Sequence, residues 1–215
     1  MEKDLSNYRQ SYEKGELLLK NITEDPITLF KEWFSEVDTR YKELEANAMT
    51  ISTIGTDGFP KSRVVLLKKY GENGFIFYTN YNSEKGKAIT DNPNVCLSFF
   101  WEPAERQIII KGKAFKTTEL ESDTYFKSRP RGSQIGALVS NQSEVIKNRA
   151  LLEKRKITIE TELENKDVPR PKHWGGFVIK PISVEFWQGR QNRLHDRIRY
   201  TKSEKNTWNI ERLEP

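Results

Sequence analysis

Short runs of β-branched and aromatic residues, separated by turns rich in Gly, Asn and Pro, restrict the fold of this chain most. Between residues 49 and 116 these runs follow one another closely, and TDGFP and GENG are typical turn segments. The predicted strands span residues 49–54, 62–70, 75–80, 95–101, 106–116, 174–187, 197–202 and 206–213. Because consecutive strands joined by short turns pair in antiparallel fashion, this pattern predicts an antiparallel barrel or a strongly curled sheet.

Helices are predicted between these strands in an irregular order. The first begins at Asp25, a capping residue that is followed by Pro26 at the first helical position, and it continues to about Asn47. Thr118 and Glu121 form a capping box that predicts the start of another helix. The predicted helices span residues 25–47, 83–92, 118–129, 133–140 and 143–165. This order does not alternate as a parallel βαβ fold would, so the fold class is predicted to be mainly β with flanking helices.

The first 20 residues differ from the rest of the chain. They are polar and weakly patterned, which predicts a mobile N-terminal arm or lid over residues 1–20. We expect residues 21–215 to form a single domain, since 215 residues suit one substantial domain.

Composition narrows the class of function. Lys and Arg number 36 against 31 Asp and Glu, which gives a net charge of +5, and acids and bases are interspersed along most of the chain. This mixing disfavours nucleic-acid binding, which uses a concentrated basic surface. Strictly apolar runs stop at four residues, the first 16 residues contain no apolar signal core, and Cys96 is the only cysteine. We therefore expect a cytoplasmic protein without a membrane partner.

The segment FWQGRQNRLHDRIRY, residues 186–200, contains four arginines and one of the two histidines. Such a cluster can face a polyanion, or it can bind a small phosphorylated ligand in a pocket. Other groups suited to phosphate occur at predicted strand ends and helix starts, where backbone N–H groups are available, as at Ser83 and Ser133. In the strand 62–70, period-2 alternation places Arg63 and Lys68 on opposite faces, so they would not reach the same phosphate.

Several motifs together resemble the pyridoxamine 5'-phosphate oxidase family. RVVLLK, FYTN, ERQI, YFKSRPRGSQIGA, NQS, WGGF, EFWQG, RLHDR and a closing W-x-I-x-RL-x-P occur in this order, and the match covers nearly the whole chain. The resemblance implies an antiparallel split barrel that binds FMN and works as a homodimer, with FMN at the subunit interface. It also implies an oxidase that converts pyridoxamine 5'-phosphate and pyridoxine 5'-phosphate to pyridoxal 5'-phosphate and reduces O2 to H2O2.

The resemblance also assigns site residues. Flavin contacts are implied for Arg63, Val64, Val65, Leu66, Leu67, Lys68, Tyr78, Thr79, Ser83, Lys85, Gln107, Gln142, Ser143, Trp187 and Arg197. Substrate contacts are implied for Arg9, Tyr12, Lys68, Tyr125, Arg129, Ser133, Arg193 and His195. Arg193 and His195, which orient the substrate ring, are the implied catalytic residues, and Arg9 and Tyr12 belong to a lid. No metal site is expected.

One residue departs from the family pattern, and two other functions stay open. The position after Ser83 is usually Arg in this family, where it helps to hold the FMN phosphate, but here it is Glu84. The first alternative is a split-barrel flavin reductase that acts on another substrate; it would lack Tyr125, Arg129, Arg193 and His195. The second is a basic RNA-binding β-barrel, which would interleave aromatic residues with cations on exposed strands.

Overall fold

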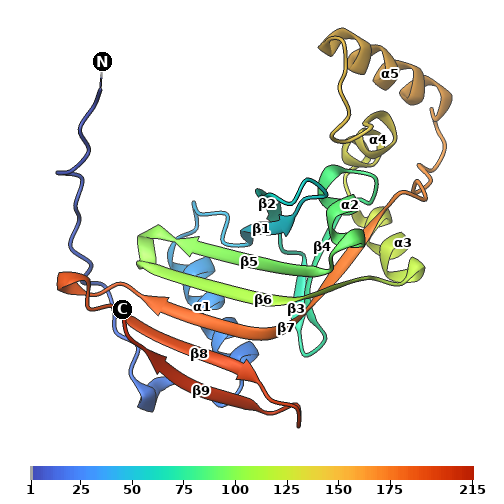
Figure 1. Cartoon of the computed structure of the whole chain (residues 1–215). Coiled ribbons are helices and arrows are strands. Elements are labelled where there is room, and N and C mark those ends of the chain that lie inside the picture. The colour runs from blue at the N-terminus through green and yellow to red at the C-terminus, as the bar shows by residue number, and fades with distance from the viewer. Residues whose placement is uncertain (1) are drawn as a thin grey trace. The chain divides into compact units, whose positions relative to one another are not determined.

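The computed structural model describes residues 2–215, and its strands form the antiparallel sheet that the short β-branched and aromatic runs predict (Figure 1). The strands are β1 (Ala48–Ile54), β2 (Pro60–Leu66), β3 (Lys69–Gly71), β4 (Gly74–Asn80), β5 (Asn94–Trp101), β6 (Arg106–Lys116), β7 (Trp174–Gln188), β8 (Asp196–Lys202) and β9 (Trp208–Leu213). The helices are α1 (Pro26–Arg40), α2 (Glu84–Asp91), α3 (Glu119–Ser128), α4 (Arg131–Val139) and α5 (Arg149–Glu162), with short 3₁₀ turns at Leu19–Asn21, Glu102–Ala104 and Gln191–Arg193. The predicted mainly β architecture with flanking helices is confirmed.

Hydrogen bonds order the strands as β2-β1-β5-β6-β7-β4-β3, and β8 and β9 extend the sheet from β7. The pairings of β3 with β4, β4 with β7, β7 with β8, and β8 with β9 are all antiparallel. The long strand β7 pairs with β4 along residues 174–179 and with β8 along residues 183–188. This strand therefore brings the WGGF motif beside FYTN and the EFWQG motif beside the arginine-rich segment.

Helix starts follow the predicted capping residues. The Asp25 side chain accepts a hydrogen bond from Thr28 N, Ser83 caps α2 through Gly86 N, and the capping box of Thr118 and Glu121 is formed. Helix ends were predicted less well. Helix α1 ends at Arg40 instead of Asn47. The start of the last helix also differs, since α5 begins at Arg149, after Asn148 whose side chain accepts from Leu151 N, instead of at residue 143.

The chain divides into two compact units, and each has its own core. The first unit comprises residues 2–50, 96–111 and 181–215, where buried rings pack edge to face, as in Phe30 against Phe99 and Trp33 against Phe186. The second unit comprises residues 51–95 and 112–180, where Phe77 packs against Phe177. The predicted boundaries, an arm over residues 1–20 and one domain over residues 21–215, stay a prediction. Across residues 2–215, no helix combines the length and apolarity that a bilayer span requires.

Candidate active site

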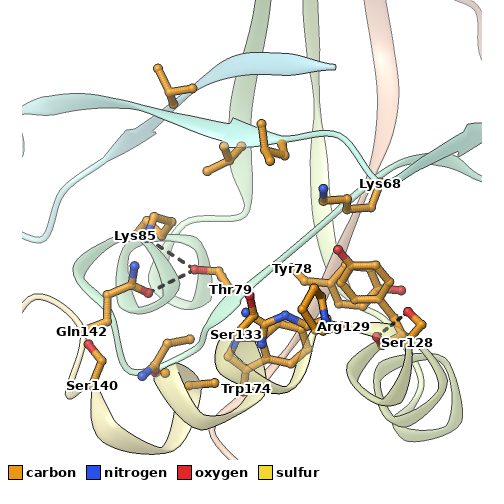
Figure 2. A pocket seen from close by; sticks show the side chains of 18 residues that line it. Lys68, Tyr78, Thr79, Lys85, Ser128, Arg129, Ser133, Ser140, Gln142 and Trp174 are labelled. Carbon is orange, nitrogen blue, oxygen red and sulfur yellow. Dashed lines mark hydrogen bonds between the residues drawn. The ribbon is translucent and has the colours of Figure 1, made fainter. Parts of the chain in front are cut away.

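A pocket of about 670 Å³ lies in the second unit, where β2, β4, α2, α3 and α4 meet (Figure 2). Eleven of the residues that the sequence assigned to the site line it: Val64, Val65, Leu66, Lys68, Tyr78, Thr79, Lys85, Tyr125, Arg129, Ser133 and Gln142. The pocket is also lined by residues that had no assigned role, namely Asn80, Ser128, Pro130, Gly136, Ala137, Ser140 and Trp174. Residues from segments up to about a hundred positions apart in sequence thus share one cavity.

Lys85 lies in the first turn of α2 and is buried, with 8% of its surface exposed. Its ammonium donates to two hydroxyl oxygens, those of Thr79 at 3.3 Å and Ser83 at 3.5 Å, and the Thr79 hydroxyl donates in turn to Gln142 Oε1 at 3.4 Å. Burial, and then the nearby Arg63 cation, lower the pKa of Lys85 below its usual range. No carboxylate in residues 2–215 forms an ion pair with this amine, so the site is suited to an anion that comes from solution.

Arg129 follows α3 and is the second cation of the pocket. Its Nη1 atom is buried without a hydrogen-bond partner in the described chain, and burial lowers the pKa of its guanidinium. The guanidinium lies 4.5 Å from the ring centre of Trp174. A buried donor that lacks an acceptor carries a substantial desolvation cost, which an oxyanion in the pocket would offset.

Stacked aromatic side chains line the pocket together, and Figure 2 labels two of them, Tyr78 and Trp174. Tyr78 and Tyr125 stack with centroids 3.9 Å apart and planes 17° apart, and Tyr78 lies parallel to Trp174 at 5.6 Å. Arg170 fixes Trp174 by donating to its carbonyl oxygen at 2.6 Å and by pairing with Asp123 and Glu119 of α3. Sequence reasoning gave Trp174 no role, although the WGGF motif that contains it was a usable signal.

The strand predicted over residues 62–70 is broken at Leu67 and Lys68, between β2 and β3. Lys68 lines the pocket, whereas Leu67 is 4% exposed and belongs to the core. Arg63 does not line the pocket, and its Nη1 donates to Thr53 Oγ1 at 2.7 Å and to Lys61 O at 2.8 Å. Arg63 thus lies outside the lining that contains Lys68, but the strand whose alternation predicted this separation is broken before Lys68. Ser133 lies in the first turn of α4 but does not cap it, because the helix already begins after Pro130.

Glu84 is an exposed residue at the start of α2 that pairs with β2. Its carboxylate accepts a hydrogen bond from Lys61 Nζ at 2.6 Å, and its other oxygen lies 4.0 Å from Arg63 Nη2. The hydrogen bond from Lys61 lowers the pKa of Glu84. Lys61 also lies 3.0 Å from Asp57, so two carboxylates surround a single lysine beside the predicted phosphate residues.

The other predicted site residues lie in the first unit or outside the lining of the pocket. Ser83 and Ser143 belong to the second unit, and Ser143 has a left-handed backbone with φ of 76°. In the first unit, Gln107 Nε2 donates to Ser98 Oγ at 3.4 Å. The rings of Tyr12, Trp187 and His195 cluster there, with centroids between 4.7 and 5.9 Å apart. Arg9 and Arg193 are exposed.

The arginines of residues 186–200 mostly face carboxylates of this chain. Arg190 contacts Glu16 at 3.2 Å, Arg197 contacts Glu185 at 2.8 Å, and Arg199 contacts Glu211 at 2.8 Å. Ion pairs within the chain neutralise much of this charge, which disfavours the polyanion interpretation.

His195 is held as an acceptor at one ring nitrogen. Its Nδ1 accepts a hydrogen bond from the backbone N–H of Arg190 at 3.1 Å, so the neutral ring carries its proton on Nε2. Burial, and then the Arg193 cation, lower the pKa of His195. The ring is therefore suited to donate a hydrogen bond through Nε2 rather than to carry charge.

Comparison with known proteins agrees with these features. The family model described as pyridoxamine 5'-phosphate oxidase matches residues 36–161, and the model described as the pyridoxine 5'-phosphate oxidase C-terminal dimerisation region matches residues 174–215. The chain belongs to the pyridoxamine 5'-phosphate oxidase family.

Relatives named pyridoxine/pyridoxamine 5'-phosphate oxidase match over almost their full length. The protein from Flavobacterium johnsoniae is 67% identical over 98% of both chains, and the one from Christiangramia forsetii is 55% identical over 100% of both.

Solved structures of similar fold support the predicted split-barrel class. PhzG from Burkholderia lata 383, solved with tetrahydrophenazine-1-carboxylic acid, is 28% identical with a TM-score of 0.87, covering 94% of this chain and 100% of that one. A pyridoxamine 5'-phosphate oxidase-related, FMN binding protein from Nostoc punctiforme shares the fold at 14% identity and a TM-score of 0.69, covering 86% of this chain and 97% of that one.

The bond at His195 Nδ1 predicts a titration behaviour for this family member. We expect the His195 imidazole to be neutral at pH 7, protonated on Nε2, with a titration midpoint below the 6.5 of an unperturbed histidine. The pKa of His195 is lower in the folded than in the unfolded chain. Its contribution to the free energy of unfolding is therefore complete above about pH 6.5 and is lost as the pH falls through the pKa of the folded state. Nitrogen-15 NMR of the imidazole ring, assigned with a His195→Asn variant, measures both the tautomer and the titration midpoint. A midpoint at or above 6.5 would contradict the assignment.

Proposed function

We propose that this chain is an FMN-dependent oxidase that converts pyridoxamine 5'-phosphate and pyridoxine 5'-phosphate to pyridoxal 5'-phosphate, with reduction of O2 to H2O2. The observation that carries the proposal is the pair of cations, Lys85 and Arg129, that line one pocket without a carboxylate partner in the described chain. In a member of this family, two such cations support binding of two phosphate groups, one from the cofactor and one from the substrate.

The end of the pocket near α2 would hold the FMN phosphate. Lys85 supplies the buried cation there, the hydroxyls of Thr79 and Ser83 lie beside it, and Arg63 contributes charge from β2. When bound, FMN supplies the redox chemistry by taking two electrons from the substrate and passing them to O2. Val64, Val65 and Leu66 would place their strand along the flavin, as the resemblance implies.

The end of the pocket near α3 would hold the substrate phosphate. Arg129 supplies the unpaired donor, and Lys68, Tyr125 and Ser133 line the same cavity. Because the Arg129 guanidinium packs against Trp174, its direction is set before the phosphate arrives, which lowers the entropic cost of binding.

Arg193 and His195 would orient the substrate ring. A neutral His195 with a proton on Nε2 can donate to an oxygen substituent of the substrate ring. The exposed Arg193 guanidinium can reach a ligand without first breaking an ion pair in the described chain. The role proposed for both residues is placement of the reacting carbon, so neither has to accept a proton during the reaction.

We further propose a homodimer in which FMN contacts both chains. The match of residues 174–215 to a dimerisation region supports this assembly. The implied flavin contacts Gln107, Trp187 and Arg197 lie in the first unit, whereas the pocket is formed by the second, and Gln142 and Ser143 would complete the flavin site from the second unit.

A flavin enzyme with another substrate is the second candidate, because PhzG has a similar fold and was solved with a tetrahydrophenazine carboxylic acid. The unpaired Arg129 beside Lys68 favours a ligand that carries a phosphate over one that carries only a carboxylate, since a phosphate dianion engages two cations.

The proposal is tested on the purified full-length protein. We expect a yellow protein whose flavin, released by denaturation, is FMN and not FAD, and which forms H2O2 and pyridoxal 5'-phosphate in equal amounts from pyridoxine 5'-phosphate. A protein that stays colourless after incubation with FMN, or that binds FMN but oxidises neither phosphorylated vitamer, would refute the proposal.

Replacing Arg193 tests substrate placement. Arg193→Gln should lower kcat/KM for pyridoxamine 5'-phosphate by about tenfold to a hundredfold, the effect of losing one charged hydrogen bond, and should leave FMN affinity unchanged. Arg199→Gln removes an arginine from the same segment that pairs with Glu211, so it should change kcat/KM by less than about threefold. Equal losses of kcat/KM in the two variants would show that Arg193 acts only through the positive charge of the segment and not through its own contact with the substrate.

Position 84 tests how this chain holds the cofactor phosphate. Glu84 places a negative charge beside Arg63 and Lys85, so FMN affinity should increase in the order Glu84, Glu84→Gln, Glu84→Arg, by about twofold to fivefold at each step because the site is exposed. Flavin fluorescence titration measures this series. Glu72→Arg, which makes the same change in charge in the turn between β3 and β4, controls for net charge. An unchanged affinity across the series would mean that Lys61 fully neutralises Glu84.

A further inference from the structure

Glu105 is a buried carboxylate that contacts the N-terminal segment, and neither the sequence motifs nor the resemblance gave it a role. It is 7% exposed and ends the 3₁₀ turn Glu102–Ala104 in a left-handed conformation with φ of 55° and ψ of 40°. Its Oε2 atom accepts hydrogen bonds from the backbone N–H groups of Glu13 at 2.8 Å and Lys14 at 2.9 Å. A buried carboxylate that is satisfied by two backbone donors fixes the peptide that carries them.

The main chain of Glu105 holds a second segment. Its carbonyl oxygen accepts from Gly189 N at 2.8 Å and from the Gln188 side chain at 3.2 Å. Gln188 is fully buried and accepts from Arg106 Nε at 2.9 Å, so the end of β7 is tied to this turn through both backbone and side chain. One residue thus connects residues 13–14 with residues 188–189, all within the first unit.

These two connections bring Tyr12 against the ring cluster. The Tyr12 ring lies 5.7 Å from Trp187 and 5.9 Å from His195. Gly189 lies directly against this ring, since a Cβ at position 189 would come within 2.7 Å of Tyr12 Cδ2. Gly15 packs equally tightly on Gln188, where an added Cβ would lie 2.9 Å from Oε1. The glycines allow the close approach, and the Glu105 carboxylate supplies the directional contact that keeps Tyr12 in place.

We propose that Glu105 is a positioning residue that anchors the N-terminal segment at Glu13 and Lys14 and thereby holds Tyr12 against Trp187 and His195. The consequence for substrate binding rests on the proposed function, in which Tyr12 and His195 contact the substrate. The anchor itself does not depend on that function, because it consists of contacts within the chain. The contacts of Glu105 described above join segments of this chain to one another, so we expect a replacement of Glu105 to affect KM more than kcat.

A second anchor lies farther along the segment and sharpens the assignment. Leu17 N donates to Asp196 Oδ2 at 3.0 Å, and Arg212 donates to Leu17 O at 2.7 Å. Loss of Glu105 should therefore release residues up to about 15, while the contacts at Leu17 persist. An increase in backbone hydrogen exchange that is limited to residues up to about 15 would distinguish loss of a local anchor from general unfolding.

Glu105→Asn is the informative variant, because Asn readily adopts the left-handed conformation while its shorter side chain withdraws the acceptor. Glu105→Gln keeps the reach and loses only the charge. Glu102→Gln is the matched control, since Glu102 lies in the same turn but is exposed. Hydrogen exchange measured by mass spectrometry on peptides over residues 10–18, with FMN-saturated protein, reports the anchor. Steady-state kinetics with pyridoxamine 5'-phosphate report its consequence.

We expect Glu105→Asn to speed exchange over residues 13–15 by about tenfold or more, with Glu105→Gln intermediate and Glu102→Gln equal to the unmodified protein. KM should rise by about tenfold in Glu105→Asn while kcat stays within about threefold, and FMN affinity should not change. Unchanged exchange in Glu105→Asn, or an equal increase in Glu102→Gln, would overturn the anchor. Faster exchange with an unchanged KM would overturn the positioning role. An unmodified protein that fails to oxidise the substrate would instead refute the proposed function, and the exchange result would still test the anchor.

Discussion

The desolvation of two cations, Lys85 and Arg129, is the constraint on which the candidate site depends. Burial lowers the pKa of both groups, and neither has a carboxylate partner in the described chain. Such groups do not stabilise the fold by themselves, because a buried donor without an acceptor lowers the free energy of unfolding of a protein that is only marginally stable. The surrounding elements offset this cost: the capped start of α2 presents Lys85, and Trp174, fixed by Arg170, supports Arg129. An anionic ligand that binds there returns the lost interaction and should stabilise the folded chain by linkage.

The parts of the fold that could be predicted from the sequence are those decided by local interactions. Asp25, Ser83 and Thr118 mark helix starts because each side chain accepts a hydrogen bond from the backbone N–H group three residues later. Helix ends carry weaker local signals. Apolar residues recur at spacings of three and four from Ile27 to Leu44, which suggested a helix to about Asn47, but Tyr41 and Leu44 lie beyond the actual end at Arg40. The break between β2 and β3 at Lys68 was also not visible, since the residues of this segment all suit a strand and the interruption depends on tertiary packing.

In the candidate site, too, the residues within motifs could be predicted, whereas contacts between distant segments could not. Motifs placed Lys68, Tyr78, Tyr125 and Arg129 in one site, and the structure brings their side chains to one pocket. Trp174 and Glu105 were not assigned because their contacts join segments that are distant in sequence. Trp174 stacks with Tyr78 across the β4 and β7 pairing, and Glu105 contacts Glu13, which is 92 residues away. The WGGF and ERQI motifs contain these two residues, but a motif does not show which distant segment a side chain contacts, whereas a capping residue and its partner are neighbours along the chain.

Within residues 2–215, Lys85 and Arg129 differ from the other wholly or partly buried cations named above in lacking a counter-charge. Arg170 is nearly buried but pairs with Asp123 and Glu119, and Glu105 is satisfied by two backbone N–H groups, so both are complete within the chain. The arginines at positions 197 and 199 are likewise paired with carboxylates. Lys85 and Arg129 differ because their side chains contact hydroxyls and aromatic rings, and no carboxylate in residues 2–215 forms an ion pair with either of them. Counting basic residues in the sequence cannot separate these two classes, since the distinction lies in whether the fold supplies the counter-charge. Arg170 is therefore a structural residue, whereas the cost of burying an unpaired guanidinium supports the proposal that Arg129 binds a phosphate.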